Sequence, residues 1–400
     1  MLQNILIATF SIWQEDKRTS INGMIEPMLS YFLPKAKTID LIDGFHPGSS
    51  NVISLLEQYK NEKLVNKKTL LISLLLYPLL KMQNNNATQI LFKIRDFFAV
   101  LEISLRGGKK YDLFIGLESI YTLAGIVLKR LNIVSNVVYY VSDYSPNRYE
   151  GWFNSLYLMI DRICAKNADY IWDVSPAMHP ARIKAGLDPK KAAPVILLPN
   201  ALFPEQITQV PEDKIEPFSL VYAGTLTTSN GPDIAIEAMA IVLKQYPKTT
   251  LHIFGSNGDD QKRIKTLIKK YSMEKSVLFH GFITQVVDIT NAIKTYSLGL
   301  APYLDIPGSH RKYGDATKLR LYMGAGIPII TTSVPPLGKE VHSFGAALIV
   351  KDNPKDLSLG IEKLFEDKKL YWEMRKKSIA YGRNNTWENT YKNAFSVMNL

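Results

Sequence analysis

The sequence offers little of the chemistry that disulfides and metal sites require. It has 400 residues with a single cysteine, Cys164, and its six histidines are scattered without metal-ligand spacing. One cysteine excludes an internal disulfide framework and a cysteine metal cluster. We therefore expect no metal site, and we expect Cys164 to be a small buried residue of a helix.

Long apolar runs are also missing. The longest one, residues 70–80, is too short for a membrane-spanning helix, which takes ~20 residues. The segment MLQNILIATF at the start has neither the basic region nor the long apolar stretch of a signal peptide, and it is typical of a first buried strand. We expect a cytoplasmic protein, and a peripheral position on the inner face of the membrane is a further hypothesis.

A third absence concerns charge runs and low-complexity tracts. The net charge is +11, but the excess of basic residues is spread over both halves of the chain. Such a balance favours anionic partners, among them nucleic acid, acidic lipid and phosphorylated substrates. No zinc-finger, basic-zipper or RNA-binding signature is present, so nucleic acid is not expected as a partner.

Apolar runs alternate with amphipathic segments along the chain, and 46% of its residues are hydrophobic. In the first half, strands are expected at residues 5–10, 38–42, 112–117, 137–141, 170–174 and 195–198. Helices are expected at residues 24–32, 89–105, 119–131, 152–166 and 177–185, with a further helical region that ends at residue 81. This alternation is typical of a parallel, doubly wound sheet in an α/β fold.

A polar, proline-bearing connector within residues 199–217 precedes a second alternation. Its expected strands are residues 219–223, 250–254, 277–279, 298–301, 329–331 and 347–350. Its expected helices are residues 232–245, 261–270, 286–295, 317–323, 354–365 and 370–382. We predict two Rossmann-like domains, residues 1–203 and 218–383, with ligands at the carboxyl ends of the strands in the cleft between them.

Residues 315–332, DATKLRLYMGAGIPIITT, are typical of a short helix, a glycine turn and a buried strand. The hydroxyl of Thr317, the ammonium of Lys318 and the free backbone N–H groups of a helix N-terminus favour a bound anion, and a diphosphate fits best. The alternative is a capped helix with a solvated lysine.

Glycine turns follow three expected strands of the second domain. Gly224, in the segment YAGTL, lets the backbone approach a phosphate closely. Gly255 ends the segment LHIFG, and Gly281, between His280 and Phe282, follows the next strand, so both turns are placed to flank a nucleobase. Ordinary tight turns are the alternative for each, and the dinucleotide-binding fingerprint is absent.

In this order the motifs resemble those of GT-B glycosyltransferases, and the second domain resembles sequence-classified glycosyltransferase family 4, the glycosyl transferases group 1. The segments that carry the resemblance are YAGTL (222–226), IAIEAMAIVLKQYP (234–247), LHIFG (251–255), VLFHGF (277–282), TKLRLYMGAGIPIITT (317–332) and SIAYGRNNTWENTY (378–391). It implies two Rossmann-like domains that face a central cleft, the first binding the acceptor and the second the nucleotide sugar. It also implies a closing helix, residues 384–400, that crosses back to the first domain.

The resemblance assigns roles to individual residues. The implied donor diphosphate site consists of Gly224, Thr225, Thr317, Lys318 and Arg311. The implied nucleoside contacts are Gly255, His280, Gly281, Phe282 and Leu321. The chain departs from the family at Tyr313 and Leu321, where two glutamates are usual, and at Thr225 and Asn230, where an arginine and a lysine are usual. Lys318 matches the family lysine, and we expect His310, Arg311 and Lys312 to supply the missing positive charge.

Candidate residues of the first domain also follow expected strands. Asp143, after the strand at 137–141, is the candidate base or acceptor contact, and a loop-capping aspartate is the alternative. Asn22 and Gly23, in the first β–α loop, and His46, after the second strand, are expected on the acceptor side. Glu118 points toward the same cleft, although a surface role is favoured for it.

The segment 60–81 combines an apolar run with flanking lysines. A basic-flanked apolar helix can lie in the headgroup region of an anionic membrane without crossing it. The alternative is a core helix of the first domain with solvated lysines.

Together these features predict a metal-independent glycosyltransferase of the hexosyltransferase type. It would move a sugar from a nucleotide diphosphate sugar to a hydroxyl acceptor, such as a lipid-linked saccharide or another cell-envelope glycan. No pair of acids has the spacing of an Asp-X-Asp metal site at an expected strand end, and the donor is a substrate, so no cofactor is expected. Two alternatives stay open: a non-catalytic GT-B-like binding subunit, which the missing glutamates favour, and a nucleotide-sugar epimerase or hydrolase.

Overall fold

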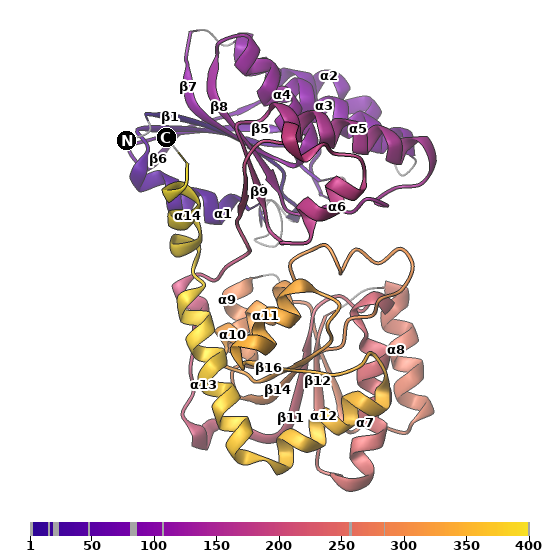
Figure 1. Ribbon diagram of the computed structural model, residues 1–400. Coiled ribbons are helices and arrows are strands. Elements are labelled where there is room, and N and C mark those ends of the chain that lie inside the picture. The colour runs from indigo at the N-terminus through magenta and orange to yellow at the C-terminus, as the bar shows by residue number, and fades with distance from the viewer. Residues whose placement is uncertain are drawn as a thin grey trace. The chain divides into compact units, whose positions relative to one another are not determined.

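Two sheets organise the chain, one in each of two compact units (Figure 1). The computed structural model describes residues 3–14, 17–18, 24–46, 49–80, 86–105, 108–255, 258–283 and 285–398. Unit 1 consists of Met1–Leu198 and Tyr391–Leu400, and unit 2 of Pro199–Thr390. The boundary at residue 198 lies where the proline-bearing connector begins.

The sheet of unit 1 is doubly wound around its first strand. Its strands are β1 (Asn4–Thr9), β4 (Thr38–Asp43), β5 (Leu55–Lys60), β6 (Lys63–Thr69), β7 (Tyr111–Leu117), β8 (Val134–Val141), β9 (Tyr170–Asp173) and β10 (Val195–Leu197). They lie in the order β10-β9-β8-β7-β1-β4-β5-β6. Strand β1 pairs in parallel with β4 on one side and with β7 on the other, so the connections diverge between β1 and β7. Such a switch point leaves a crevice at the carboxyl ends of the strands.

Helices cover the sheet of unit 1. They are α1 (Ile25–Phe32), α2 (Leu71–Leu80), α3 (Asn86–Leu105), α4 (Glu118–Arg130), α5 (Gly151–Asn167) and α6 (Met178–Lys184). The helices α2, α3, α4 and α5 pack successively against one another (Figure 1). Cys164 in α5 is buried, as expected for a small apolar residue. The last helix, α14 (Trp387–Ser396), brings the ring of Tyr391 to 5.0 Å from that of Tyr31 in α1.

The prediction of a helical segment before residue 70 was wrong. Residues 55–69 form an antiparallel hairpin, β5 and β6, and only residues 71–80 are helical, as α2. The hairpin turns at Asn61 and Glu62, whose φ angles of 47° and 67° match the pattern of a type I′ turn. This turn has no glycine, and β6 is exposed on both faces, so neither a turn signal nor an apolar alternation marked the hairpin in the sequence.

The sheet of unit 2 has the Rossmann strand order. Its strands are β11 (Glu216–Ala223), β12 (Thr250–Phe254), β13 (Val277–Gly281), β14 (Tyr296–Ala301), β15 (Ile329–Thr331) and β16 (Ala347–Ile349). The order is β13-β12-β11-β14-β15-β16, and neighbouring strands are parallel. The switch point therefore lies between β11 and β14, where a phosphate-bearing ligand is expected. Both sheets confirm the predicted α/β, doubly wound fold class.

An apolar layer covers each face of this sheet, because successive side chains of β11 point to opposite faces. Leu220 and Tyr222 face one layer, and Val221 and Ala223 face the other. The helices are α7 (Pro232–Gln245), α8 (Gly258–Lys270), α9 (Val286–Ile293), α10 (Thr317–Gly324), α11 (Pro336–Phe344), α12 (Pro354–Glu366) and α13 (Lys368–Asn384). The first layer receives apolar side chains from α7, α8 and α12, and the second from α9, α10 and α11. Helix α11 was not predicted because it begins at a pair of prolines, Pro335 before it and Pro336 at its first position, although a proline at the first helical position is well tolerated.

Candidate functional site

Two glycines bring the ends of β11 and β12 into close contact in unit 2. Gly224 has a φ of 138°, and its backbone N–H donates a hydrogen bond of 2.8 Å to the carbonyl of Phe254. A Cβ atom on Gly255 would lie 2.1 Å from the carbonyl oxygen of Gly224, and one on Gly224 would lie 3.0 Å from Cε of Lys318. Only glycine fits these contacts, so two of the predicted turns and the predicted lysine form one site.

Lys318 is buried in the first turn of α10 with its charge unbalanced. Lys318 is only 7% exposed, and its Nζ has no hydrogen-bond partner among the described residues. Nζ lies 3.6 Å from the centre of the Tyr222 ring and 5.3 Å from that of Tyr303. Burial lowers the pKa of Lys318 well below its ordinary value, and the positive charge of Arg311 lowers it further. A buried ammonium beside a second cation is typical of a site that an anion completes.

The start of α10 adds the hydroxyl of Thr317, which is exposed. The backbone N–H groups of Thr317 and Leu319 already donate to backbone carbonyls, at 3.1 and 2.9 Å. The carboxylate of Asp315 is directed elsewhere, because it pairs with Nε of Arg320 at 2.7 Å and accepts the N–H of Asn200 at 3.0 Å. The negative charge next to the helix start is thereby neutralised within unit 2.

Two of the positions that depart from the family, Asn230 and Leu321, have contacts within unit 2. The amide nitrogen of Asn230 donates to the carbonyl of Thr225 at 3.1 Å and to Oγ1 of Thr227 at 3.0 Å, so Asn230 braces the loop after β11. Leu321 is half-buried and packs against an apolar layer of the sheet. An aliphatic side chain there cannot accept a hydrogen bond from a ribose hydroxyl.

The predicted nucleoside residues lie at the ends of β12 and β13. Gly281 pairs with Phe254, the residue before Gly255. The ring of His280 stacks on Phe254 with centroids 4.5 Å apart, and its Nε2 lies 2.9 Å from Nδ1 of His252. His280 is therefore already engaged with the sheet, whereas Phe282 is 51% exposed at the same edge.

In unit 1, Asp143 follows β8 and is held by two neighbours. Its carboxylate forms an ion pair of 2.9 Å with Nη1 of Arg148, and half of the side chain is exposed. The carboxylate of Glu118 accepts hydrogen bonds from the backbone N–H groups of Ser142 and Asp143 at 3.0 and 3.2 Å, and from Oγ of Ser142 at 2.6 Å. The side chain of Glu118 therefore fixes the loop that carries Asp143.

The surface role favoured for Glu118 was wrong. Glu118 is half-buried, and the loss of hydration raises the pKa of its carboxyl group, whereas the charge of Arg148 and the bonds from Ser142 lower that pKa in part. Glu118 also has a φ of 67°, an uncommon backbone conformation for a residue other than glycine. Strained residues of this kind cluster at functional sites. The short distance in sequence between a strand end and a helix start gave no indication of this burial.

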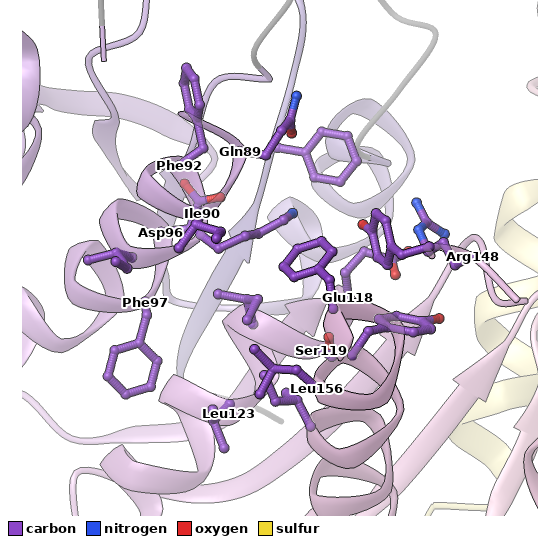
Figure 2. A pocket seen from close by; sticks show the side chains of 18 of the residues that line it. Gln89, Ile90, Phe92, Asp96, Phe97, Glu118, Ser119, Leu123, Arg148 and Leu156 are labelled. Carbon is purple, nitrogen blue, oxygen red and sulfur yellow. The ribbon is translucent and has the colours of Figure 1, made fainter. Parts of the chain in front are cut away.

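Next to Asp143 and Glu118 lies a cavity of about 630 Å³ (Figure 2). Its lining comes from α3, from the first turns of α4 and from α5, together with residues that follow β1, β4, β7 and β8. The predicted acceptor-side residue His46 is part of this lining, and burial lowers its pKa. Asn22 and Gly23 lie outside the described residues. The sequence analysis did not find this cavity, although the aromatic cluster at residues 149–157 was a usable signal.

The chain combines two Rossmann-like units, and a buried, unpartnered lysine lies beside a glycine turn at the carboxyl ends of the strands in the second unit. Solved structures share this fold over the whole chain. Sucrose-phosphate synthase from Thermosynechococcus elongatus is 16% identical with a TM-score of 0.72, and the match covers 99% of this chain and 100% of that one. HepE from Anabaena, in complex with UDP and glucose, is 15% identical with a TM-score of 0.67, covering 99% and 100%. WaaG, a glycosyltransferase involved in lipopolysaccharide biosynthesis, is 13% identical with a TM-score of 0.65, covering 99% and 100%.

The chain therefore has the fold of GT-B glycosyltransferases. Residues 204–385 match the model of the family described as Glycosyl transferases group 1, the family that the motifs of the second unit resemble. Compared by sequence, no curated protein matches the chain. At these identities the likeness to solved structures establishes the fold, and the residues of the site carry the argument about function.

Proposed function

We propose that this protein is a glycosyltransferase that moves a sugar from a nucleotide diphosphate sugar to a hydroxyl acceptor, without a metal ion. The observation that carries the proposal is the buried ammonium of Lys318, which lies against Gly224 with no hydrogen-bond partner among the described residues. HepE, which shares the fold, was solved with UDP and with UDP-glucose. A nucleotide diphosphate fits the same combination of a glycine turn, a helix N-terminus and cations.

In this proposal, unit 2 stabilises the leaving diphosphate. Negative charge grows on the diphosphate as the bond to the sugar breaks, and Lys318, Arg311 and the N-terminus of α10 are placed to balance it. Because Lys318 is buried and unpaired beforehand, it needs little reorganisation to receive that charge. Asp143 is proposed to contact or deprotonate the acceptor hydroxyl. Its carboxylate would then bind the acceptor hydroxyl as well as Arg148.

A binding screen tests the donor site. Titration calorimetry with UDP-, GDP-, dTDP- and CMP-sugars should find one nucleotide class that binds, and Lys318→Ala should abolish that binding. Lys339→Ala, at an exposed lysine of α11, is the matched control and should leave binding unchanged. Binding of no nucleotide sugar would favour the non-catalytic binding subunit. Turnover of the nucleotide sugar without any acceptor, faster than transfer, would favour the epimerase or hydrolase.

We further propose that the acceptor is a lipid-linked or other cell-envelope glycan, reached at an anionic membrane surface through residues 60–81, of which Lys81 lies outside the described residues. Helix α2 exposes Leu71, Leu74, Leu75 and Leu79 by 45–76%, which argues against the alternative of a core helix. Lys60, Lys63 and Lys68 of the neighbouring hairpin are exposed as well. An apolar helix beside basic side chains suits an anionic interface. No helix among the described residues is long and apolar enough to cross a membrane.

Vesicle flotation tests this second proposal. The protein should float with vesicles that contain anionic phosphatidylglycerol and should float less with purely zwitterionic ones, since lysines attract anionic headgroups. The double change Leu74→Glu with Leu75→Glu should abolish flotation. Leu359→Glu, at a leucine 52% exposed on α12 of unit 2, is the control and should float normally. Equal flotation of the double variant and the control would contradict the membrane surface while leaving the donor site untouched.

A further inference from the structure

The cavity of unit 1 is a groove with apolar walls. Helix α4 packs against both α3 and α5, and we call the lining residues of its first turns the floor of the groove and those of α3 and α5 its walls. Ile120 and Leu123 belong to the floor, Phe97 to the α3 wall, and Phe153 and Leu156 to the α5 wall. Figure 2 labels Phe97, Leu123 and Leu156 in this lining. The walls are mostly aromatic and aliphatic side chains, and Gln89, Lys93 and Asp96 of α3 are the polar members of the lining there.

One end of the groove is polar. Glu118, Ser142, Asp143 and Arg148 line it where β7 and β8 end, and His46 lines it after β4. Asp143, the candidate acceptor contact, therefore shares one continuous cavity with the apolar walls. A cavity of this size, mostly apolar with a few polar groups together, is typical of a small-molecule site.

The apolar lining continues onto the outer surface. Ile94 and Phe98 of α3 are 40% and 47% exposed, and Trp152 of α5 is 70% exposed. All three also line the cavity. Large apolar side chains grouped on a surface mark an interaction site more often than chance exposure does.

We propose that this groove binds the single hydrocarbon chain of an amphipathic acceptor, whose sugar head reaches the polar end beside Asp143. The identity of the head rests on the proposed function, but binding of the chain does not. A peptide in the groove would place backbone N–H and C=O groups against mostly aromatic and aliphatic walls, which would leave most of these groups without hydrogen-bond partners. A hydrocarbon chain has no such groups, and the burial of its methylenes is favourable.

The proposal is tested with alkyl glucosides and glucose, which share one head group. Octyl β-D-glucoside, used below its micelle concentration, should bind saturably in titration calorimetry and change the fluorescence of Trp152 at the rim. Glucose should bind at least tenfold more weakly. Geranyl β-D-glucoside tests whether the groove prefers an isoprenoid to a straight chain. Binding of either glucoside supports the proposal that the groove binds a hydrocarbon chain. Equal binding of glucose and both glucosides would overturn that proposal.

Two variants locate the binding. Leu123→Trp fills the floor of the groove and should weaken binding of octyl glucoside at least tenfold. Leu156→Trp narrows the opposite wall, should act in the same way, and serves if Leu123→Trp fails to fold. Leu359→Trp on α12 is the control for an added tryptophan. Unchanged binding in a folded groove variant would overturn the inference, with folding judged by circular dichroism.

The failure of this inference is distinguishable from failure of the proposed function. A protein that binds octyl glucoside but no nucleotide sugar would retain the groove and lose the glycosyltransferase proposal. A groove variant that still binds the nucleotide sugar but not octyl glucoside would support both. Lys318→Ala should leave octyl glucoside binding unchanged, because Lys318 belongs to unit 2.

Discussion

The ammonium nitrogen of Lys318 lies 3.6 Å from the centre of the Tyr222 ring. The face of an aromatic ring attracts a cation, but it replaces only part of the hydration that a buried ammonium loses. Because Nζ has no hydrogen-bond partner among the described residues, the unliganded protein carries an electrostatic cost at the site where the donor diphosphate is proposed to bind.

Removing this charge should stabilise the unliganded protein and abolish donor binding. Lys318→Met is expected to raise the free energy of unfolding at pH 7 by about 1–3 kcal/mol. The sign follows from the pKa: burial lowers it in the folded state, so the unfolded chain binds the proton more tightly and wild-type stability rises with pH toward about 10.5. The gain in the variant should shrink over the same range. Urea unfolding at pH 7–10 measures it, with Lys339→Met as control; a less stable variant at pH 7 would contradict the prediction.

Gly224→Ala should weaken nucleotide-sugar binding by more than backbone strain alone would cause. Gly224 and Gly308 both have positive φ angles, 138° and 78°. An added Cβ atom at Gly224 meets Cε of Lys318 at 3.0 Å, whereas at Gly308 it meets nothing within 4 Å. Both alanine variants should lose about 1–3 kcal/mol of stability from strain. Only Gly224→Ala should also weaken nucleotide-sugar binding in calorimetry, and equal affinities of the two variants would argue against the contact.

Asp143→Asn should lower the rate of transfer without changing donor affinity. General acid–base groups contribute about 10²–10⁴-fold to rates, so we expect a fall in kcat of that order. Arg148→Met removes the ion-pair partner of Asp143 and should also lower the rate, because the carboxylate is then no longer held in place. Radiolabelled sugar transfer measures both. An Asp143→Asn variant with full kcat would contradict the catalytic role and favour the alternative, a loop-capping aspartate.

The buried guanidinium of Arg182 should be essential for the stability of unit 1. It bonds to Asp161 at 3.1 Å and to Asp173 at 2.6 Å, and all three side chains are almost fully buried. Arg182→Met would leave two buried carboxylates without their partner and should cost about 3–5 kcal/mol in urea unfolding. Lys191→Met breaks the exposed contact with Asp188 and should change stability by less than about 1 kcal/mol. Similar losses in both variants would refute the prediction.

Acid should destabilise unit 2 through a pair of histidines. Burial lowers the pKa of His252, and the nearby His280 lowers it further. The unfolded chain therefore takes up a proton near pH 6.5 while folded His252 resists it, so stability should fall as the pH drops from about 7.5 to 5.5. His280→Gln removes the second ring and should reduce this fall. Thermal unfolding across that range measures it, with exposed His342→Gln as control; identical slopes for the two variants would contradict the coupling.

Local patterns predicted most elements because they depend on neighbours in sequence. The strand at 250–254 and the helix at 232–245 have the predicted bounds, since an apolar run ending in glycine and a proline at the first helical position are local signals. The β5–β6 hairpin was missed because its turn, Asn61 and Glu62, has no glycine. The site residues Gly224, Gly255 and Lys318 were found because turns and helix starts can be read from the sequence.

By itself, the sequence determined the doubly wound architecture of both units, the glycine turns and the position of Lys318 at a helix start. Backbone conformation and amphipathic period follow from adjacent residues, so these features needed no knowledge of contacts. Only the tertiary structure decided that Lys318 is buried without a hydrogen-bond partner among the described residues, that Glu118 accepts a hydrogen bond from Ser142, and that α3 and α5 line a groove. Burial and ion pairing depend on residues brought together from distant parts of the chain, and no local pattern contains that information.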